Sequence, residues 1–174
     1  MSQVIPFIPR SNYQLTELDL LLYSFSSAAR ILGIKKEDIA ALTPQAENCL
    51  VELHNKPWQA LIPRQEFLNQ FISDRRAKAR VLIPTKHIDN GTKWTVWNEE
   101  ANTRYEVTIF QDKVVCTCPD WHNQFMAFGH SQVCCKHCYC VLNQLGYGSL
   151  KDYLKAWQEG GKLFNLQKIM NRKR

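Results

Sequence analysis

Cys116-Thr117-Cys118-Pro119-Asp120-Trp121 is the stretch that decides how the second half of this chain folds. A spacer of sixteen residues separates Cys118 from the tripeptide Cys135-Lys136-His137. Three thiols and one imidazole are the donors that a tetrahedral zinc ion takes in a closed structural site. We therefore predict one structural zinc ion with the ligands Cys116, Cys118, Cys135 and His137.

The residues beside these donors predict how each arm reaches the ion. Pro119-Asp120 is a bend-forming pair, and a bend there turns both sulfurs of the first arm toward one point. Residues 136–145 are predicted to form a helix that ends at Gly146. Cys135 then lies at the N-terminus of this helix, where the exposed amide groups favour a thiolate.

Taken together, these features resemble the SWIM-type zinc finger: a strand, Cys-x-Cys-Pro-Asp-aromatic, a loop, Cys-Lys-His and a short apolar helix. The resemblance covers residues 93–145. It implies a ββα zinc module that holds DNA or a protein partner, with the four donors named above as zinc ligands. The chain departs from the family in its long spacer and in three additional cysteines, Cys134, Cys138 and Cys140.

The additional cysteines leave alternatives open. Cys138 falls at helical spacing with the apolar residues that follow it, which places it in the core. Cys134 adjoins Cys135 and is an alternative ligand in its place. Cys134, Cys140 and His130 are also the donors from which a second metal site would be built.

Composition favours a folded, basic, intracellular protein. The formal charge is +6, and zinc held by three thiolates adds two and subtracts three, which leaves +5. A basic chain favours polyanions or acidic surfaces as partners, although a modest positive charge can be a solubility feature alone. Six of the seven cysteines lie within residues 116–140, which favours metal over a disulfide framework and a cytoplasmic or nuclear location. No apolar run has the length of a signal peptide or a membrane span.

The first half of the chain is predicted to be helical. Residues 1–14 are expected to form an extended arm. Thr16 and Asp19 form a capping-box pattern that opens a helix ending at Gly33. Cys49 is expected in the core as a small hydrophobic residue. Three further helices are predicted, over residues 35–42, 43–57 and 63–81.

Positive charge gathers near the end of the last of these helices. Four cations fall within residues 75–80 and spread over more than one helix face. Such a surface suits contacts with phosphates, and it is equally typical of a solvated helix end with cations placed well for the helix dipole. The candidate nucleic-acid contacts are Arg75, Arg76, Lys78, Arg80, Lys136, Arg172, Lys173 and Arg174.

The second half is predicted to be an antiparallel β-meander with helices. Period-two runs predict strands over residues 94–97, 105–109 and 113–116. Ser149 and Asp152 form a second capping-box pattern, which opens a C-terminal helix that stops at Gly160-Gly161. The predicted fold class is α+β. Its expected parts are a helical region over residues 1–88, the SWIM-like domain over 89–146, and a C-terminal helix with a basic tail over 147–174.

Several classes of enzyme are disfavoured. The chain has no His-Glu-x-x-His motif, no Gly-rich phosphate loop and no Gly-x-Ser-x-Gly motif. Metal ligation would also occupy Cys135 and His137, the thiol–histidine pair best placed for nucleophilic catalysis. Residues 121–130 carry three aromatic side chains, which either roof the metal site or stack on unpaired bases. His122 and His130 are expected to be surface groups or groups around the site rather than ligands.

These observations lead to one expected function and one alternative. We expect a non-enzymatic zinc-binding protein whose finger is a DNA-binding or DNA-associated accessory module, with DNA preferred to RNA and with no membrane or small-molecule substrate. The alternative is a zinc-stabilised protein–protein interaction adaptor within a larger nucleic-acid-processing complex.

Overall fold

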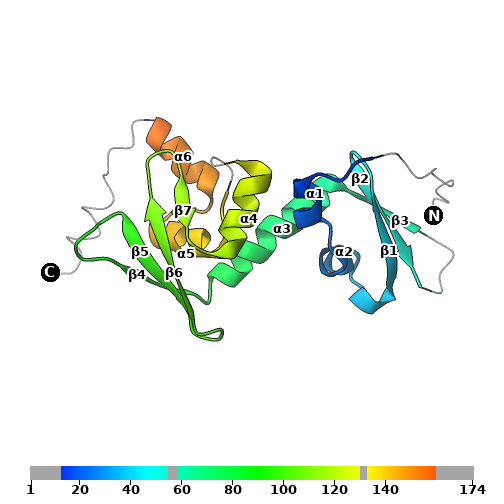
Figure 1. Cartoon of the computed structure of the whole chain (residues 1–174), viewed down its shortest axis with the longest axis horizontal. Coiled ribbons are helices and arrows are strands. Elements are labelled where there is room, and N and C mark those ends of the chain that lie inside the picture. The colour runs from blue at the N-terminus through cyan, green and yellow to red at the C-terminus, as the bar shows by residue number, and fades with distance from the viewer. Residues whose placement is uncertain (1–12, 55–58, 130–132, 160–174) are drawn as a thin grey trace. The chain divides into compact units, whose positions relative to one another are not determined.

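The computed structural model describes residues 13–54, 59–129 and 133–159 (Figure 1). Within these ranges the chain is α+β, as predicted, with six α-helices and seven strands in two antiparallel sheets. Contacts divide the chain into two compact units, Met1–Asp74 and Arg75–Arg174. We call them the first and the second unit. In the same described ranges, no helix has both the length and the apolar character needed to cross a bilayer.

The first unit begins with two short helices, α1 (Glu17–Leu22) and α2 (Phe25–Leu32). The predicted capping box of Thr16 and Asp19 is confirmed at the start of α1. The prediction of one continuous helix up to Gly33 is wrong. Ser24 is extended and its side chain accepts a hydrogen bond from the Ser27 amide, so it caps a new helix rather than continuing the old one.

Beyond this point, up to Pro63, the predicted helical character of the N-terminal region fails. A short 3-10 helix, η1 (Lys36–Asp38), is followed by β1 (Ile39–Pro44), β2 (Asn48–Leu53) and β3 (Gln59–Pro63), which pair in the order β1-β2-β3. The helices predicted over residues 35–42 and 43–57 are therefore wrong. Cys49, Leu50 and Val51 are consecutive and all buried, and such a run suits the central strand of a sheet as well as a buried helix.

Three prolines lie in edge strands. Pro44 ends β1 and Pro63 ends β3, while Pro84 lies in β4 (Ile83–Lys86), at one side of the second sheet. Proline cannot donate to a strand ladder and is tolerated at such edges.

Helix α3 (Arg64–Ala79) confirms the helix predicted over residues 63–81. The second sheet has the order β4-β5-β6-β7, with β5 (Lys93–Asn98), β6 (Thr103–Ile109) and β7 (Val114–Cys116). These three strands are the predicted meander, and the turns fall where expected.

Three helices complete the second unit: α4 (Pro119–Phe128), α5 (Lys136–Gln144) and α6 (Leu150–Gln158). Helix α5 packs against all four strands of the second sheet (Figure 1). Val96, Val107, Val141 and Leu142 are fully buried in the core of this unit. Strand β7, which ends at Cys116, and helix α5, which begins after Cys135, are thus parts of one hydrophobic core.

Candidate metal centre

The structure brings the four predicted ligands together. The donor atoms of Cys116, Cys118, Cys135 and His137 all lie within 4.8 Å of one another, and all four residues are buried. Residues from two places in the sequence, one at the end of β7 and one at the start of α5, therefore form a single Cys₃His cluster that could hold a metal ion.

The spacing of the donors suits a tetrahedral ion of the size of zinc. The Nδ1 atom of His137 lies 3.8 Å from the sulfur of Cys116 and 3.8 Å from that of Cys135. With zinc–sulfur and zinc–nitrogen bonds of about 2.3 and 2.0 Å, a tetrahedron separates such atoms by about 3.5 Å. A contraction of a few tenths of an ångström along these two edges would bring the donors into coordination distance.

The first arm is shaped by the backbone after β7. Cys116 is the last residue of β7, and Cys118 is the N-cap of α4. The amide of Cys118 donates to the Cys116 sulfur at 3.5 Å, and the amide of Trp121 donates to the Cys118 sulfur at 3.3 Å. Both hydrogen bonds favour a negatively charged sulfur. The arm is thus prepared for two thiolates.

Helix α4 replaces the bend predicted at Pro119-Asp120 and takes up residues 121–128 of the loop predicted between the two arms. The missed signal was local: proline at the first helical position followed by an acidic residue in the first turn is a helix start. Cys118 takes the place of the usual Ser or Asp cap. This correction changes the site, because a helix N-terminus now faces Cys118.

The second arm is the start of α5, as predicted. Cys135 is the N-cap of this helix and His137 lies in its first turn. The Nδ1 atom of His137 is the nitrogen that faces the sulfurs. Its Nε2 atom is buried with no hydrogen-bond partner among the residues that the structure describes, and the ring of Tyr105 lies beside the imidazole ring, with 4.8 Å between the two ring centroids. Nδ1 is therefore the nitrogen with which His137 could bind a metal ion in this cluster.

Without a metal ion, the pKa values of the two thiols of the first arm differ. The hydrogen bond with Cys118 opposes ionisation of Cys116, but those with Cys135, Cys138 and His137 outweigh it, and the pKa of Cys116 falls to about 6. The bond with Cys116 favours ionisation of Cys118, but Cys135 and burial act more strongly together and raise its pKa to about 12. A divalent cation held by these residues would require both sulfurs as thiolates, because thiolate is the form that ligates.

The other cysteines are buried separately from this cluster or beside it. Cys138 is fully buried, as predicted, and its sulfur accepts a hydrogen bond of 3.5 Å from the Cys135 sulfur. Cys140 donates to the carbonyl of Leu82 at 3.5 Å. Burial raises the pKa of Cys140 to about 11 and that of Cys49 to about 12. Within the described ranges, no second cluster of three potential metal donors occurs.

Two of the candidate nucleic-acid contacts are engaged inside the second unit. Arg75 binds the Asp120 carboxylate through two hydrogen bonds of 3.1 and 2.6 Å. Arg76 donates to the carbonyl of Gly148 and lies over the ring of Tyr139.

The remaining candidates differ in exposure. Lys78 and Arg80 are exposed and Lys136 is half-buried, whereas Arg172, Lys173 and Arg174 lie outside the described residues. Arg76 is also exposed, but its side chain is engaged in the contacts named above, which leaves Lys78 and Arg80 as the exposed candidates outside those contacts.

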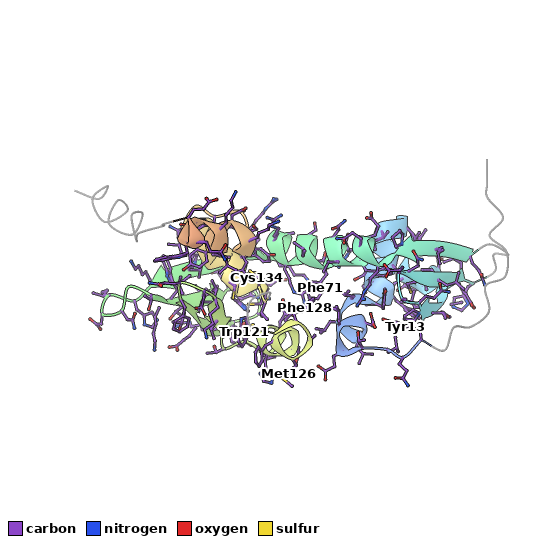
Figure 2. All side chains as sticks on the ribbon, turned by 90° about the horizontal axis from the view of Figure 1, so that it is seen from above. Tyr13, Phe71, Trp121, Met126, Phe128 and Cys134 are labelled. Carbon is purple, nitrogen blue, oxygen red and sulfur yellow. The ribbon has the colours of Figure 1, made fainter. Side chains whose placement is uncertain are left out.

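The aromatic residues after the first arm lie on α4 (Figure 2). Trp121 is buried, donates from Nε1 to the carbonyl of Val114 at 3.0 Å and stacks on Phe125. It therefore fixes α4 against β7, next to two ligands. Met126 is 60% exposed, and His122 is exposed as expected. His130 lies outside the described residues.

No protein-family model, curated protein or solved structure matches this chain. The identification of the candidate centre therefore rests on its four residues and their geometry.

Proposed function

We propose that this chain is a non-enzymatic zinc-binding protein in which a SWIM-like finger serves as a DNA-binding or DNA-associated accessory module. The observation that carries the proposal is the gathering of four buried donors, Cys116, Cys118, Cys135 and His137, within 4.8 Å. Zinc is favoured over other metals because three thiolates and one imidazole around a tetrahedral position match its preferred ligands.

A structural role suits this centre better than a catalytic one. The four ligand residues are at most 3% exposed, whereas a catalytic zinc keeps a coordination position open to water or substrate. The donor cluster also contains no carboxylate that could handle protons. Zinc then supplies folding free energy to the second unit rather than chemistry.

The first experiment is metal stoichiometry. Elemental mass spectrometry of the purified protein should give one zinc per chain. Thiol titration before and after chelation should show that the three ligand cysteines become reactive when the metal is removed, together with the other cysteines of the second unit that unfolding exposes. A metal-free protein with all seven thiols equally reactive would refute the zinc centre, and an ion other than zinc at the same stoichiometry would correct only its identity.

DNA binding is supported by charge and by the family resemblance. The chain carries a net charge of +6, and Lys78 and Arg80 are exposed at and just after the end of α3. Each DNA phosphate that a cation neutralises releases counterions. A plot of the logarithm of the binding constant against the logarithm of the salt concentration therefore has a slope of about −0.9 for each phosphate contact. Binding carried by several cations should therefore weaken steeply as salt rises.

Fluorescence anisotropy with a labelled DNA duplex tests this proposal. The salt concentration is varied between about 50 and 200 mM, roughly a fourfold range. The double variant Lys78→Ala/Arg80→Ala should weaken binding and reduce the salt slope by about two. The matched control is Lys35→Ala/Lys36→Ala, which removes two exposed cations of the first unit. Equal losses in both variants would indicate a general charge effect, and no binding at low salt would refute the DNA role.

A protein partner is the second candidate. It is favoured by apolar side chains exposed in the second unit: Met126 is 60% exposed, Val81 71% and Ile88 99%. An apolar interface should respond little to salt. Capture of a protein partner that survives high salt and is lost in Met126→Asp would favour this candidate over DNA.

A further inference from the structure

We propose that Gln124 is a positioning residue of the metal centre, and that Asp120 and Arg75 support it. This inference rests on the proposed zinc centre and adds residues that no ligand pattern reveals. Gln124 lies in α4 and is only 2% exposed. A buried amide is costly unless its polar atoms are bonded, so its partners define what it does.

The amide of Gln124 connects the two ligand-bearing arms. Its Oε1 atom accepts a hydrogen bond of 3.3 Å from the backbone amide of Cys134, the residue directly before the ligand Cys135. Gln124 itself lies on the helix whose N-cap is the ligand Cys118. The hydrogen bond therefore ties the first arm to the backbone of the second arm, across the long spacer.

The orientation of this amide is set by its neighbours. Its Nε2 atom donates to Asp120 Oδ2 at 3.1 Å. Because the Asp120 carboxylate accepts and the Cys134 amide donates, the reversed amide would lose both bonds. The side-chain amide of Gln124 can thus make both hydrogen bonds in only one of its two orientations.

Arg75 completes the arrangement by holding Asp120. Its Nε and Nη2 atoms bind the two carboxylate oxygens at 3.1 and 2.6 Å, and its side chain is 17% exposed. The planar guanidinium group fixes the carboxylate in a plane that a lysine would not impose. The series runs from Arg75 through Asp120 and Gln124 to the backbone at Cys134.

Outer groups that orient metal ligands typically change metal affinity by about 10- to 100-fold when they are removed. We therefore expect Gln124→Met, which keeps an unbranched side chain of similar length without hydrogen bonds, to weaken zinc binding by that factor. The readout is competition with a chromophoric chelator. Zinc release to excess chelator should also be faster.

The matched control is Gln70→Met. Gln70 donates to Asp74 at 3.1 Å within α3, so it forms the same kind of glutamine–aspartate pair four residues apart, without a link to a ligand-bearing segment. Its zinc affinity should stay within about twofold of wild type. The absorption spectrum of the cobalt-substituted protein adds a readout of ligand geometry, which should change in Gln124→Met and stay unchanged in Gln70→Met.

The outcomes separate this inference from the zinc centre itself. If wild type binds no metal, the centre is refuted. If wild type binds zinc and Gln124→Met keeps wild-type affinity and cobalt spectrum, or Gln70→Met loses as much, only the positioning role is refuted. Should Gln124→Met fail to fold in excess zinc, the same measurements on Asp120→Asn decide, with about tenfold weaker binding expected and unchanged binding as the refutation.

Discussion

At the scale of single residues, neighbouring positions in α5 have different roles. His137 and Cys138 are adjacent and both buried. The Nδ1 atom of His137 faces the sulfurs of Cys116 and Cys135, whereas Cys138 lies beside the donor cluster and accepts a hydrogen bond from the Cys135 sulfur. Burial raises the pKa of Cys138 well above its usual value. Two adjacent buried side chains thus allow a test that separates ligation from packing.

His137→Ala should abolish stoichiometric zinc, because it leaves three donors and a cavity. Cys138→Ser should retain one zinc per chain while lowering the free energy of unfolding by about 1–3 kcal/mol, the cost of a hydroxyl in a buried apolar place. Elemental analysis and denaturant unfolding measure the two effects. Loss of zinc in Cys138→Ser with zinc kept in His137→Ala would mean that these two residues had been assigned to the wrong roles.

At the scale of elements, the start of α1 depends on a buried carboxylate. Asp19 is 1% exposed and accepts hydrogen bonds from Tyr13 and from the amide and hydroxyl of Thr16, while Arg64 lies 2.9 Å from its other oxygen. Burial raises the pKa of Asp19, but these hydrogen bonds and Arg64 outweigh it, and the pKa is lowered from 3.8. The folded protein therefore favours the ionised form.

The sign of the pH dependence follows from this lowered pKa. The stabilisation by Asp19 is fully present above pH 3.8 and is lost as the pH falls through the lower folded value. We expect Asp19→Asn to destabilise the first unit by about 1–3 kcal/mol at neutral pH, with the difference from wild type disappearing in acid. The control is Asp38→Asn, at the end of η1, where Asp38 is exposed. The free energy of unfolding is measured between about pH 2 and pH 7, which reaches roughly two units below and three above the ordinary carboxyl pKa. A difference between Asp19→Asn and wild type that did not change with pH would contradict this prediction.

Elements also show what could be predicted. The caps Thr16 and Ser149 and the period-two runs of the second sheet were predictable, because each signal is contained in a few neighbouring residues. The strands of the first sheet were not, because residues 35–53 contain short apolar runs that fit either a helix or a paired strand. Helix α4 was missed although Pro119 marked its start.

At the scale of the whole molecule, removal of the metal should destabilise the second unit and leave the first unit folded. The four donors all belong to the second unit, and a structural zinc contributes on the order of 10 kcal/mol to such a module. Chelation should therefore remove hydrogen-exchange protection from β5, β6, β7 and α5, while β1, β2 and β3 remain protected. Loss of protection in both sheets, or in neither, would contradict a zinc centre that supports the second unit alone.

The sequence by itself indicated the four donors that the structure gathers, the N-caps Thr16 and Ser149 and the strands that deliver the first arm, because these depend on residue type and on spacing over a few positions. Only the tertiary structure decided that the first unit contains a sheet, that Arg75 binds Asp120 rather than facing solvent, and that Gln124 joins the two arms. These outcomes depend on partners distant in the sequence. A strand, an ion pair or a buried amide is stable only when its partner is supplied by the fold.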